Sequence, residues 1–233
     1  MGEFHDTRLP GESNDYRTAR DQLLAAEMEL RKRLAEVAAL RSALPLGGPL
    51  KEDYVFEEGA TDLSDQETLI KTRLSELFDP EKNSLLIYSF MYPPDAETPC
   101  PMCTALLDSL NGNAAHVEDR INLAVVARAP TRKIRMWAKE RGWTHLRFLS
   151  SGDNTYNLDY FAETPEGNQL PAINVFQNTD QGIHHFYNAE LLYAKAQNGQ
   201  HPRHADLIWP LWNLFDLTPE GRGTDWYPRP DYS

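Results

Sequence analysis

Cysteine is scarce in this sequence, because only two occur among its 233 residues. Two cysteines are too few to form the several disulfides that stabilise many small secreted folds. No run of 18 apolar residues could span a membrane, and the chain does not open with the basic stretch and apolar run of a signal peptide. We therefore expect a soluble, cytoplasmic protein.

Basic residues are also few relative to acidic ones. Lys and Arg number 23 against 35 Asp and Glu, which gives a net charge of −12. Such a charge disfavours binding to nucleic acid and to anionic membranes, so neither is an expected partner. The glycine-rich nucleotide loops and the Gly-x-Ser-x-Gly motif of serine hydrolases are absent too. We accordingly expect no cofactor.

The two cysteines that are present form the motif Cys100-Pro101-Met102-Cys103. An uncharged apolar stretch, 84–90, precedes the motif and has the length of a strand, while leucines three and four apart in 104–110 predict a helix. At the start of that helix the first sulfur faces free N–H groups and the positive end of the helix dipole, which favours thiolate. Pro101 suits the first helical turn because its missing N–H would be unpaired there anyway.

Two structural interpretations compete with a redox role for the pair. A disulfide across two residues would stabilise the fold only weakly, because it closes a very short loop. A zinc site would need two further ligands, and the sequence holds no second Cys-x-x-Cys. Cys-x-x-Cys beside a β-α-β pattern favours thiol–disulfide chemistry, with Cys100 and Cys103 as catalytic residues.

Acidic residues surround the motif. Asp95 and Glu97 precede it and Asp108 follows it, with no basic residue between Lys82 and Arg120. Nearby carboxylates oppose thiolate formation, so this pattern predicts a dithiol of only mild reactivity.

Histidine pairs are the other candidate metal ligands. His184 and His185 lie in a predicted strand, where adjacent side chains point to opposite faces and do not readily share one site. His201 and His204 lie in a predicted loop. We therefore expect no metal site.

The order of elements predicts an α/β protein. An amphipathic helix at 15–44, ~45 Å long at 1.5 Å per residue, ends at Pro45. The remaining elements are strands at 54–56, 84–90, 121–127 and 146–150, helical turns at 72–78, helices at 104–110 and 131–141, a hairpin of 172–176 with 182–187, and helices at 189–196 and 207–215. β-α-β units followed by a hairpin give the plan of a thioredoxin-like fold, a mixed central sheet flanked by helices.

Three segments follow from this pattern. We expect an arm with the long helix at 1–48, a thioredoxin-like domain at 49–217 and an irregular tail at 218–233. Pro171 stands just before the first hairpin strand, where thioredoxin-like proteins carry a cis-proline that faces the dithiol. We therefore expect Pro171, Pro101 and Met102 to contact the substrate, and the Leu170–Pro171 bond to be cis.

The chain resembles a thioredoxin-like family catalogued as domain of unknown function 899. The resemblance covers nearly the whole chain, and the segments that carry it are Ala19-Arg20-Asp21 through Leu44-Pro45, Tyr54-Val55-Phe56, Phe90-Met91-Tyr92, the cysteine motif, Arg128-Ala129-Pro130, Gly142-Trp143, Val175-Phe176, His185-Phe186-Tyr187, Glu190 through Ala194 and Leu214 through Gly223. It implies a dithiol–disulfide oxidoreductase acting on a protein or small-molecule disulfide. Pro99 replaces the glycine expected before the first cysteine.

Two other functions stay open. The approach to Cys100 is similar to a peroxiredoxin loop, since Pro93 lies seven residues before it, but Glu97 stands where that family has Thr or Ser. Arg128 or Arg147 could supply the cation that such a peroxidase needs. Alternatively, the chain is a non-enzymatic interaction module whose cysteines are bystanders.

The long helix suggests an assembly. Leu23, Leu30, Val37 and Leu44 form one apolar stripe along it, and Leu34 and Leu40 widen this stripe. A helix that outreaches its own domain leaves part of such a stripe exposed unless a partner covers it, so we expect a homodimer through this helix.

Overall fold

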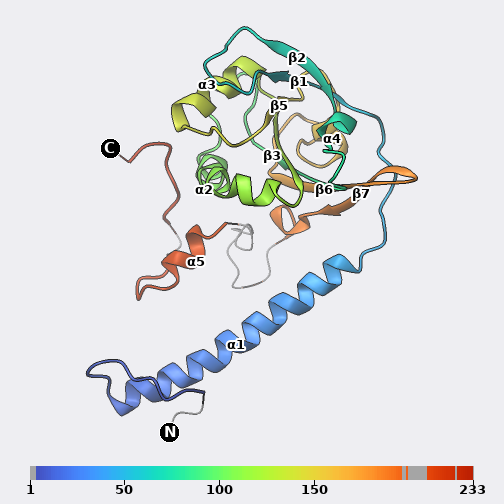
Figure 1. Ribbon diagram of the computed structural model, residues 1–233. Coiled ribbons are helices and arrows are strands. Elements are labelled where there is room, and N and C mark those ends of the chain that lie inside the picture. Colours follow the sequence, from blue (N-terminus) through green and yellow to red (C-terminus); the bar gives the residue numbers. More distant parts are fainter. Residues whose placement is uncertain (1–3, 196–197, 199–208, 224, 233) are drawn as a thin grey trace. The chain divides into compact units, whose positions relative to one another are not determined.

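The computed structural model describes residues 4–195, 198, 209–223 and 225–232 (Figure 1). The chain divides into two compact units, Met1–Pro45 and Leu46–Ser233. Each unit is described by itself below.

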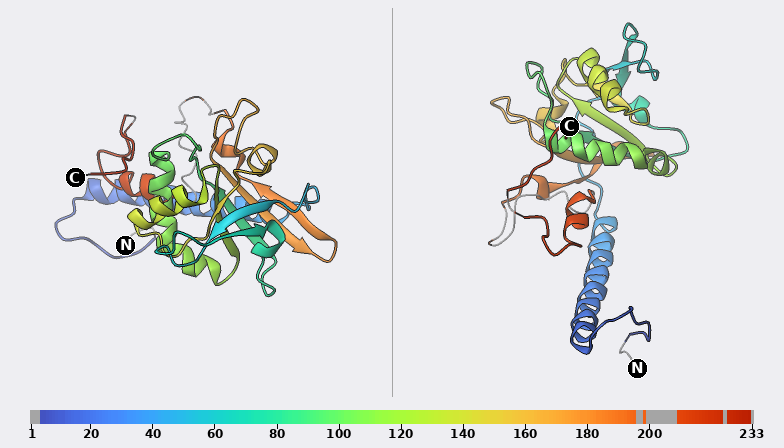
Figure 2. Two further views of the ribbon diagram at one scale, coloured as in Figure 1. Left: turned by 90° about the horizontal axis from the view of Figure 1, so that it is seen from above. Right: turned by 90° about the vertical axis from the view of Figure 1, so that its left-hand side faces the viewer.

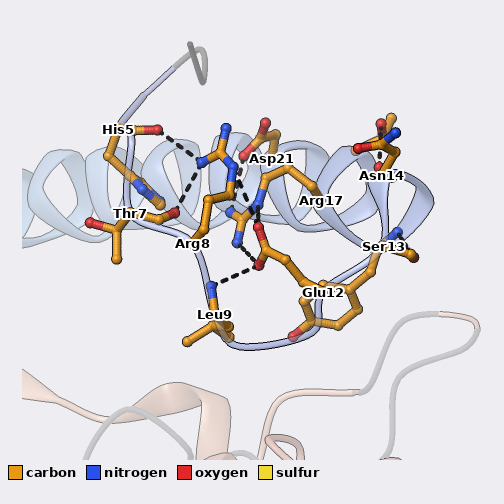
Figure 3. Close-up of polar contacts among 11 residues, drawn as sticks. His5, Thr7, Arg8, Leu9, Glu12, Ser13, Asn14, Arg17 and Asp21 are labelled. Atoms are coloured by element: carbon orange, nitrogen blue, oxygen red, sulfur yellow. Dashed lines mark hydrogen bonds and ion pairs between the residues drawn. The ribbon is translucent and has the colours of Figure 1, made fainter.

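The N-terminal unit consists of one helix and the loop before it. Helix α1, Asn14–Ser42, starts where the Ser13 hydroxyl accepts the N–H of Tyr16 at 3.1 Å. Figure 3 shows the Glu12 carboxylate between Arg8 and Arg17, where it also accepts the N–H of Leu9. The Arg17 hydrogen bond is the main reason that the pKa of Glu12 falls to about 2.

The long helix expected at 15–44 is thereby confirmed. None of the residues of α1 is buried, and Leu23, Leu30 and Leu40 are 46%, 59% and 70% exposed. The apolar stripe is therefore uncovered along the length of α1.

The second unit is organised around one seven-stranded sheet within the described residues, in the order β2-β1-β5-β4-β3-β6-β7. Its strands are β1 Val55–Gly59, β2 Leu69–Arg73, β3 Ser84–Ser89, β4 Asn122–Ala127, β5 Phe148–Ser150, β6 Ala172–Thr179 and β7 Gly182–Asn188. Neighbours β3, β4 and β5 run parallel, and the other neighbours run antiparallel. Figure 2 shows β6 and β7 as the orange hairpin at the edge of the sheet.

Two long helices connect the parallel strands. Helix α2, Pro101–Glu118, joins β3 to β4, and α3, Thr131–Arg141, joins β4 to β5. Gly142 ends α3 with φ 70°, a left-handed conformation that glycine adopts without a steric penalty. The shorter helices are η1 Leu74–Leu77, α4 Tyr156–Asp159, η2 Glu190–Leu192 and α5 Leu211–Phe215.

Two hydrophobic clusters cover the two faces of the sheet. Along β3, Leu85 and Ile87 belong to one cluster, whereas Leu86 and Tyr88 pack in the other. The cluster of Tyr88 also contains Leu106 and Leu107 from α2. Alternation along the strand therefore points Tyr88 toward α2.

The topology confirms the expected thioredoxin-like fold. Strands β4, β3, β6 and β7 stand side by side, with α2 as the crossover between the parallel pair β3 and β4 and a closing antiparallel hairpin. The long N-terminal helix and the mixed sheet complete the predicted class.

Several elements differ from the expectation. The helical turns predicted at 72–78 begin only at Leu74, because residues 69–73 pair with β1 as strand β2. Residues 151–169, where the sequence predicts no helix or strand, contain α4, whose Tyr156 is fully buried. The helix predicted at 207–215 begins at Leu211 among the described residues, after Pro210, which lacks the N–H that a helix interior requires.

Other predictions reach beyond the described residues. The helix expected at 189–196 is a single 3-10 turn, η2, as far as Lys195. His201, His204 and part of the loop that holds them lie outside the described part of the chain.

Candidate functional site

The N-terminus of α2 is built around Cys100. Its backbone N–H donates to the carbonyl oxygen of Met91 at 3.0 Å, and its own carbonyl accepts the N–H of Thr104 at 3.0 Å. Pro101 follows as the first helical residue. Cys100 is therefore the N-cap residue, and its Sγ accepts the N–H of Cys103 at 3.5 Å.

The two thiols differ in accessibility. Both cysteines are free, but Cys100 is half-buried whereas Cys103 is only 3% exposed. Cys103 belongs to the hydrophobic cluster that includes Leu106 and Leu107. A bulky disulfide can therefore meet the sulfur of Cys100 but not that of Cys103.

The same arrangement separates the acidities of the two thiols. The Cys103 side chain first, and then the N–H groups of Cys103 and Met102, lower the pKa of Cys100 to about 6, although burial opposes the change. The pKa of Cys103 is raised, first by this interaction with Cys100 and then by burial. Cys100 is the thiolate at neutral pH, and Cys103 keeps its proton.

The expectation that the neighbouring carboxylates oppose thiolate formation at Cys100 is wrong, because the pKa of Cys100 is lowered. None of Asp95, Glu97 and Asp108 is among the groups that shift the pKa of Cys100. Asp95 and Glu97 are exposed, so water screens their charge. Asp108 pairs with Arg141 and accepts the Nε1–H of Trp143 at 2.8 Å, which engages its carboxylate elsewhere.

The three residues expected to bind substrate lie at the same end of the sheet. Ala172 pairs with Ser89, the last residue of β3, so Pro171 stands beside the chain segment that leads to Cys100. Pro101 is exposed, and Met102 is half-buried against the core. The Leu170–Pro171 bond is trans, so the predicted cis bond is wrong; trans is the lower-energy isomer of most X–Pro bonds.

The sequence matches a family model described as "Bacterial protein of unknown function (DUF899)" over residues 7–232. The chain belongs to this family. Among curated proteins, none matches the DUF899 chain. Within its described residues, none of the helices combines the length and apolar character needed to cross a bilayer.

Solved structures similar to the DUF899 chain include several peroxiredoxins. The reduced 2-Cys peroxiredoxin of Plasmodium vivax is 15% identical, covers 70% of this chain and 93% of its own, and has a TM-score of 0.47. AhpC of Enterococcus faecalis is 13% identical over 70% of this chain and 87% of its own, with a TM-score of 0.48. Thioredoxin peroxidase I of Plasmodium yoelii is 15% identical over 79% of this chain and all of its own, with a TM-score of 0.47.

Both candidate arginines of a peroxidase site have other partners in the DUF899 chain. Arg128 donates to the carbonyl oxygens of Ser151 and Asn154, at 2.6 and 3.1 Å, and pairs with Glu163 at 3.1 Å. Arg147 makes two hydrogen bonds to Glu58, at 2.7 and 2.8 Å. Neither cation contributes to the low pKa of Cys100.

The adjacent histidines of β7 also have separate partners. Nδ1 of His184 lies 3.1 Å from the carbonyl oxygen of Gly182, and Nε2 of His185 lies 3.0 Å from Oδ1 of Asn174. Across the part of the chain that the structure describes, no three His, Cys, Asp or Glu side chains gather as a metal site would require.

Tyr88 is the site residue that sequence reasoning missed. It is 3% exposed, and it packs in the same hydrophobic cluster as Cys103. The only signal was alternation in the central strand, which places Leu86 and Tyr88 on one face. Sequence alone did not say that α2 would bring Cys103 to that face.

Proposed function

We propose that this chain is a thiol–disulfide oxidoreductase of thioredoxin-like type that uses the Cys100-Pro101-Met102-Cys103 dithiol. The observation that carries the proposal is the difference in accessibility and pKa between the two thiols at the start of α2. The accessible Cys100 has its pKa lowered to about 6, whereas Cys103, whose backbone N–H donates to the Cys100 sulfur at 3.5 Å, is buried and has a raised pKa. This is what a nucleophile and a resolving thiol need.

The reaction balances as two exchanges. The Cys100 thiolate attacks one sulfur of a substrate disulfide, so that a Cys100–substrate bond forms and the other substrate sulfur leaves as a thiolate. Cys103 then loses its proton and attacks the Cys100 sulfur, which forms the Cys100–Cys103 disulfide and releases the second substrate thiol. Two electrons thereby pass from the enzyme dithiol to the substrate.

The substrate in this proposal is a protein or small-molecule disulfide. Pro101 and Met102 flank the reactive sulfur, and Pro171 stands at the same end of the sheet. These residues would contact the chain on either side of the substrate disulfide. With a net charge of −12, nucleic acid and anionic membranes are not expected as partners.

Trapping of mixed disulfides tests the proposal. Cys103→Ser should accumulate a covalent adduct on Cys100, because the resolving thiol is gone, whereas Cys100→Ser should accumulate none. Trapping by Cys100→Ser alone would reverse the roles. A reduction potential below about −300 mV would instead indicate a structural bridge.

A thiol peroxidase is the second candidate, and the low pKa of Cys100 favours it as well. Peroxide would oxidise Cys100 to a sulfenic acid, and Cys103 would condense with it to a disulfide and water. Glu97 in place of a hydroxyl residue and the engagement of Arg128 and Arg147 speak against it. Stopped-flow consumption of hydrogen peroxide no faster than by a free thiol would remove this candidate.

A non-enzymatic binding role is the remaining alternative. It requires that replacing both cysteines by serine leaves all cellular activity intact. Any loss in the double variant, with the fold preserved, argues for redox chemistry.

We also propose a homodimer through α1. Its apolar stripe is exposed, with Leu30 59% and Leu40 70% accessible, and a second copy offers the same stripe in two-fold symmetry. Deletion of residues 1–44 should turn the dimer into a poorly soluble monomer. Sedimentation of the intact chain as a monomer at roughly tens of micromolar, where weak dimers associate, would overturn the idea.

A further inference from the structure

The segment 91–100 leads from the end of β3 to Cys100 and forms a closed loop. The N–H of Cys100 donates to the carbonyl oxygen of Met91 at 3.0 Å, and this hydrogen bond joins the two ends of the loop. Pro99, immediately before Cys100, is buried. The candidate nucleophile is therefore the last residue of a folded loop as well as the N-cap residue of α2.

Tyr92 is a fixed point within this loop. Its side chain is 2% exposed, and its ring makes edge contacts with Phe90 and Trp137, with centroids 5.8 and 6.5 Å apart. Its carbonyl oxygen accepts the N–H of Ala129 at 2.9 Å. From this position the Tyr92 hydroxyl donates to the carbonyl oxygen of Glu97 at 3.1 Å. Core packing of the ring thereby anchors the second half of the loop.

Lys133 of α3 provides a second anchor. Its Nζ donates to the carbonyl oxygen of Pro94 at 3.1 Å and lies 5.2 Å from the centroid of the Tyr92 ring. A cation over the face of an aromatic ring is attracted to it, so the lysine holds the loop and packs on the tyrosine at once. Both anchors bind backbone carbonyl groups, at Pro94 and Glu97, and so restrain the path of the loop itself.

We propose that Tyr92 and Lys133 are positioning residues for the second exchange, because they hold the loop that keeps the Cys100 sulfur within reach of Cys103. This inference rests on the proposed thiol–disulfide function. It assigns to two residues outside α2 a role in resolution of the mixed disulfide and none in the first attack.

The position of Cys100 depends on the loop because Cys100 is not itself helical. Its φ of −56° and ψ of 124° place it just before the first turn of α2, whereas Cys103 lies inside that helix. The N–H of Cys103 donates to the Cys100 sulfur at 3.5 Å, and this contact requires Cys100 to keep its conformation. A loop that has lost an anchor samples other conformations, and the rate of an intramolecular reaction depends steeply on how the reacting atoms are held.

The affected step is the attack of Cys103 on the mixed disulfide. The Cys103 sulfur, having given its proton to water or to the departing substrate sulfur, bonds to the Cys100 sulfur. The bond between Cys100 and the substrate breaks, and the substrate sulfur leaves with its electron pair. The first attack involves only one protein sulfur, so it needs no alignment between Cys100 and Cys103.

A single-turnover reaction with the aromatic disulfide 5,5′-dithiobis(2-nitrobenzoate) separates the two steps, since each attack releases one coloured thiolate. At about pH 8, where Cys100 with its pKa of about 6 is ionised, the first phase should be unchanged in Tyr92→Phe and in Lys133→Met. The second phase should slow by roughly fivefold in either variant, as expected for one lost hydrogen bond. Lys133 is only partly buried, so Lys133→Met keeps the inference testable if Tyr92→Phe does not fold.

Two further measurements distinguish positioning from a general loss of stability. Lys133→Arg keeps a cation and N–H donors, so it should restore most of the wild-type rate of the second phase. In glutathione redox buffers the oxidised fraction of the Cys100–Cys103 pair should fall in Tyr92→Phe and Lys133→Met, because a loosely held pair closes its disulfide less readily. A variant that is less stable but keeps the loop anchored would change neither quantity.

Tyr54→Phe and Lys139→Met are the matched controls. Tyr54 is a fully buried tyrosine whose hydroxyl donates to Asp159 at 2.8 Å, and Lys139 is an exposed lysine of the same helix as Lys133. Both phases should keep their wild-type rates in these controls. A wild-type second phase in folded Tyr92→Phe or Lys133→Met, or equal slowing of both phases, would overturn the positioning role of that residue. Absence of the first phase in the wild-type protein would instead overturn the proposed function itself.

Discussion

Helices α1 and α2 begin with the same kind of N-cap hydrogen bond, but only the N-cap of α2 is a candidate nucleophile. The Ser13 hydroxyl accepts the N–H of Tyr16 at 3.1 Å, and the Cys100 sulfur accepts the N–H of Cys103 at 3.5 Å. In both, a side chain at the N-cap satisfies an N–H three residues later. The geometry of capping therefore does not by itself create a reactive site.

The difference lies in what surrounds each cap. Ser13 is exposed, and the acidic residue beside it, Glu12, is neutralised by arginines. Cys100 is half-buried, and the Cys103 side chain in the same turn lowers its pKa. An N-cap side chain can act as a nucleophile where it ionises near neutral pH and buried neighbouring groups stabilise its charge.

The largest effect is expected when the N-cap residue of α2 is replaced by serine, the residue type that caps α1. Cys100→Ser should abolish disulfide exchange, because a serine hydroxyl does not ionise near neutral pH. The helix should still be capped, since serine is a preferred N-cap residue, so the free energy of unfolding should change by less than about 0.5 kcal/mol. Urea denaturation measures the free energy of unfolding, and a disulfide-reduction assay measures the exchange activity. A loss of stability of several kcal/mol would show that the thiolate also holds the fold.

Removing the buried donor should have the next largest effect. In Cys103→Ala the main interaction that lowers the pKa of Cys100 is gone, so this pKa should rise from about 6 toward the ordinary cysteine value. The thiolate fraction at pH 7 should fall from about nine-tenths to a few per cent, given an ordinary pKa near 8.5. The midpoint of iodoacetamide alkylation against pH measures the change.

Cys103→Ser is the matched control for that series. Its hydroxyl can still donate to the Cys100 sulfur, so its midpoint should lie between those of the wild-type protein and Cys103→Ala. Equal midpoints in all three proteins would contradict the assignment of Cys103 as the principal donor.

A smaller effect is expected at the other cap. Ser13→Ala should destabilise the first turn of α1 by about 1 kcal/mol, because the N–H of Tyr16 loses its acceptor. Amide hydrogen exchange at Tyr16 and Arg17 should quicken about fivefold. The alkylation midpoint of Cys100 should not move, and a shift there would show coupling between two caps that we regard as independent.

The elements of the fold were predictable where a sequence pattern and tertiary packing agree. Helix α3 begins at Thr131 and ends at Arg141 as expected, since Pro130 and Gly142 mark its two ends. Strand β2 was missed because its pairing with β1 is a long-range interaction, and α4 was missed because burial of Tyr156 overrides a polar local sequence.

The site was predictable in its position but not in its electrostatics. The motif, the strand before it and Pro101 placed Cys100 at the start of a helix. Counting charges along the sequence, however, predicted that carboxylates oppose the thiolate of Cys100, whereas the pKa of Cys100 is lowered. Asp108 was assigned to the dithiol by proximity in sequence, whereas Arg141 and Trp143, more than 30 residues away, engage its carboxylate.

The smallest expected effect tests that correction. Asp95 and Glu97 are exposed, and an exposed charge is screened within about 10 Å at 0.1 M salt. In the double variant Asp95→Asn and Glu97→Gln the alkylation midpoint of Cys100 should therefore fall by no more than roughly 0.3 pH units, because the local donors dominate. The direction is downward, since removing negative charge favours the thiolate. A fall of a full unit that disappears in 1 M salt would restore the importance of the acidic loop. A fall that persists in salt would point to a rearranged loop, because the Tyr92 hydroxyl bonds to the carbonyl oxygen of Glu97 at 3.1 Å. An almost unmoved midpoint, beside the large shift in Cys103→Ala, would locate the control of this thiol within one turn of α2.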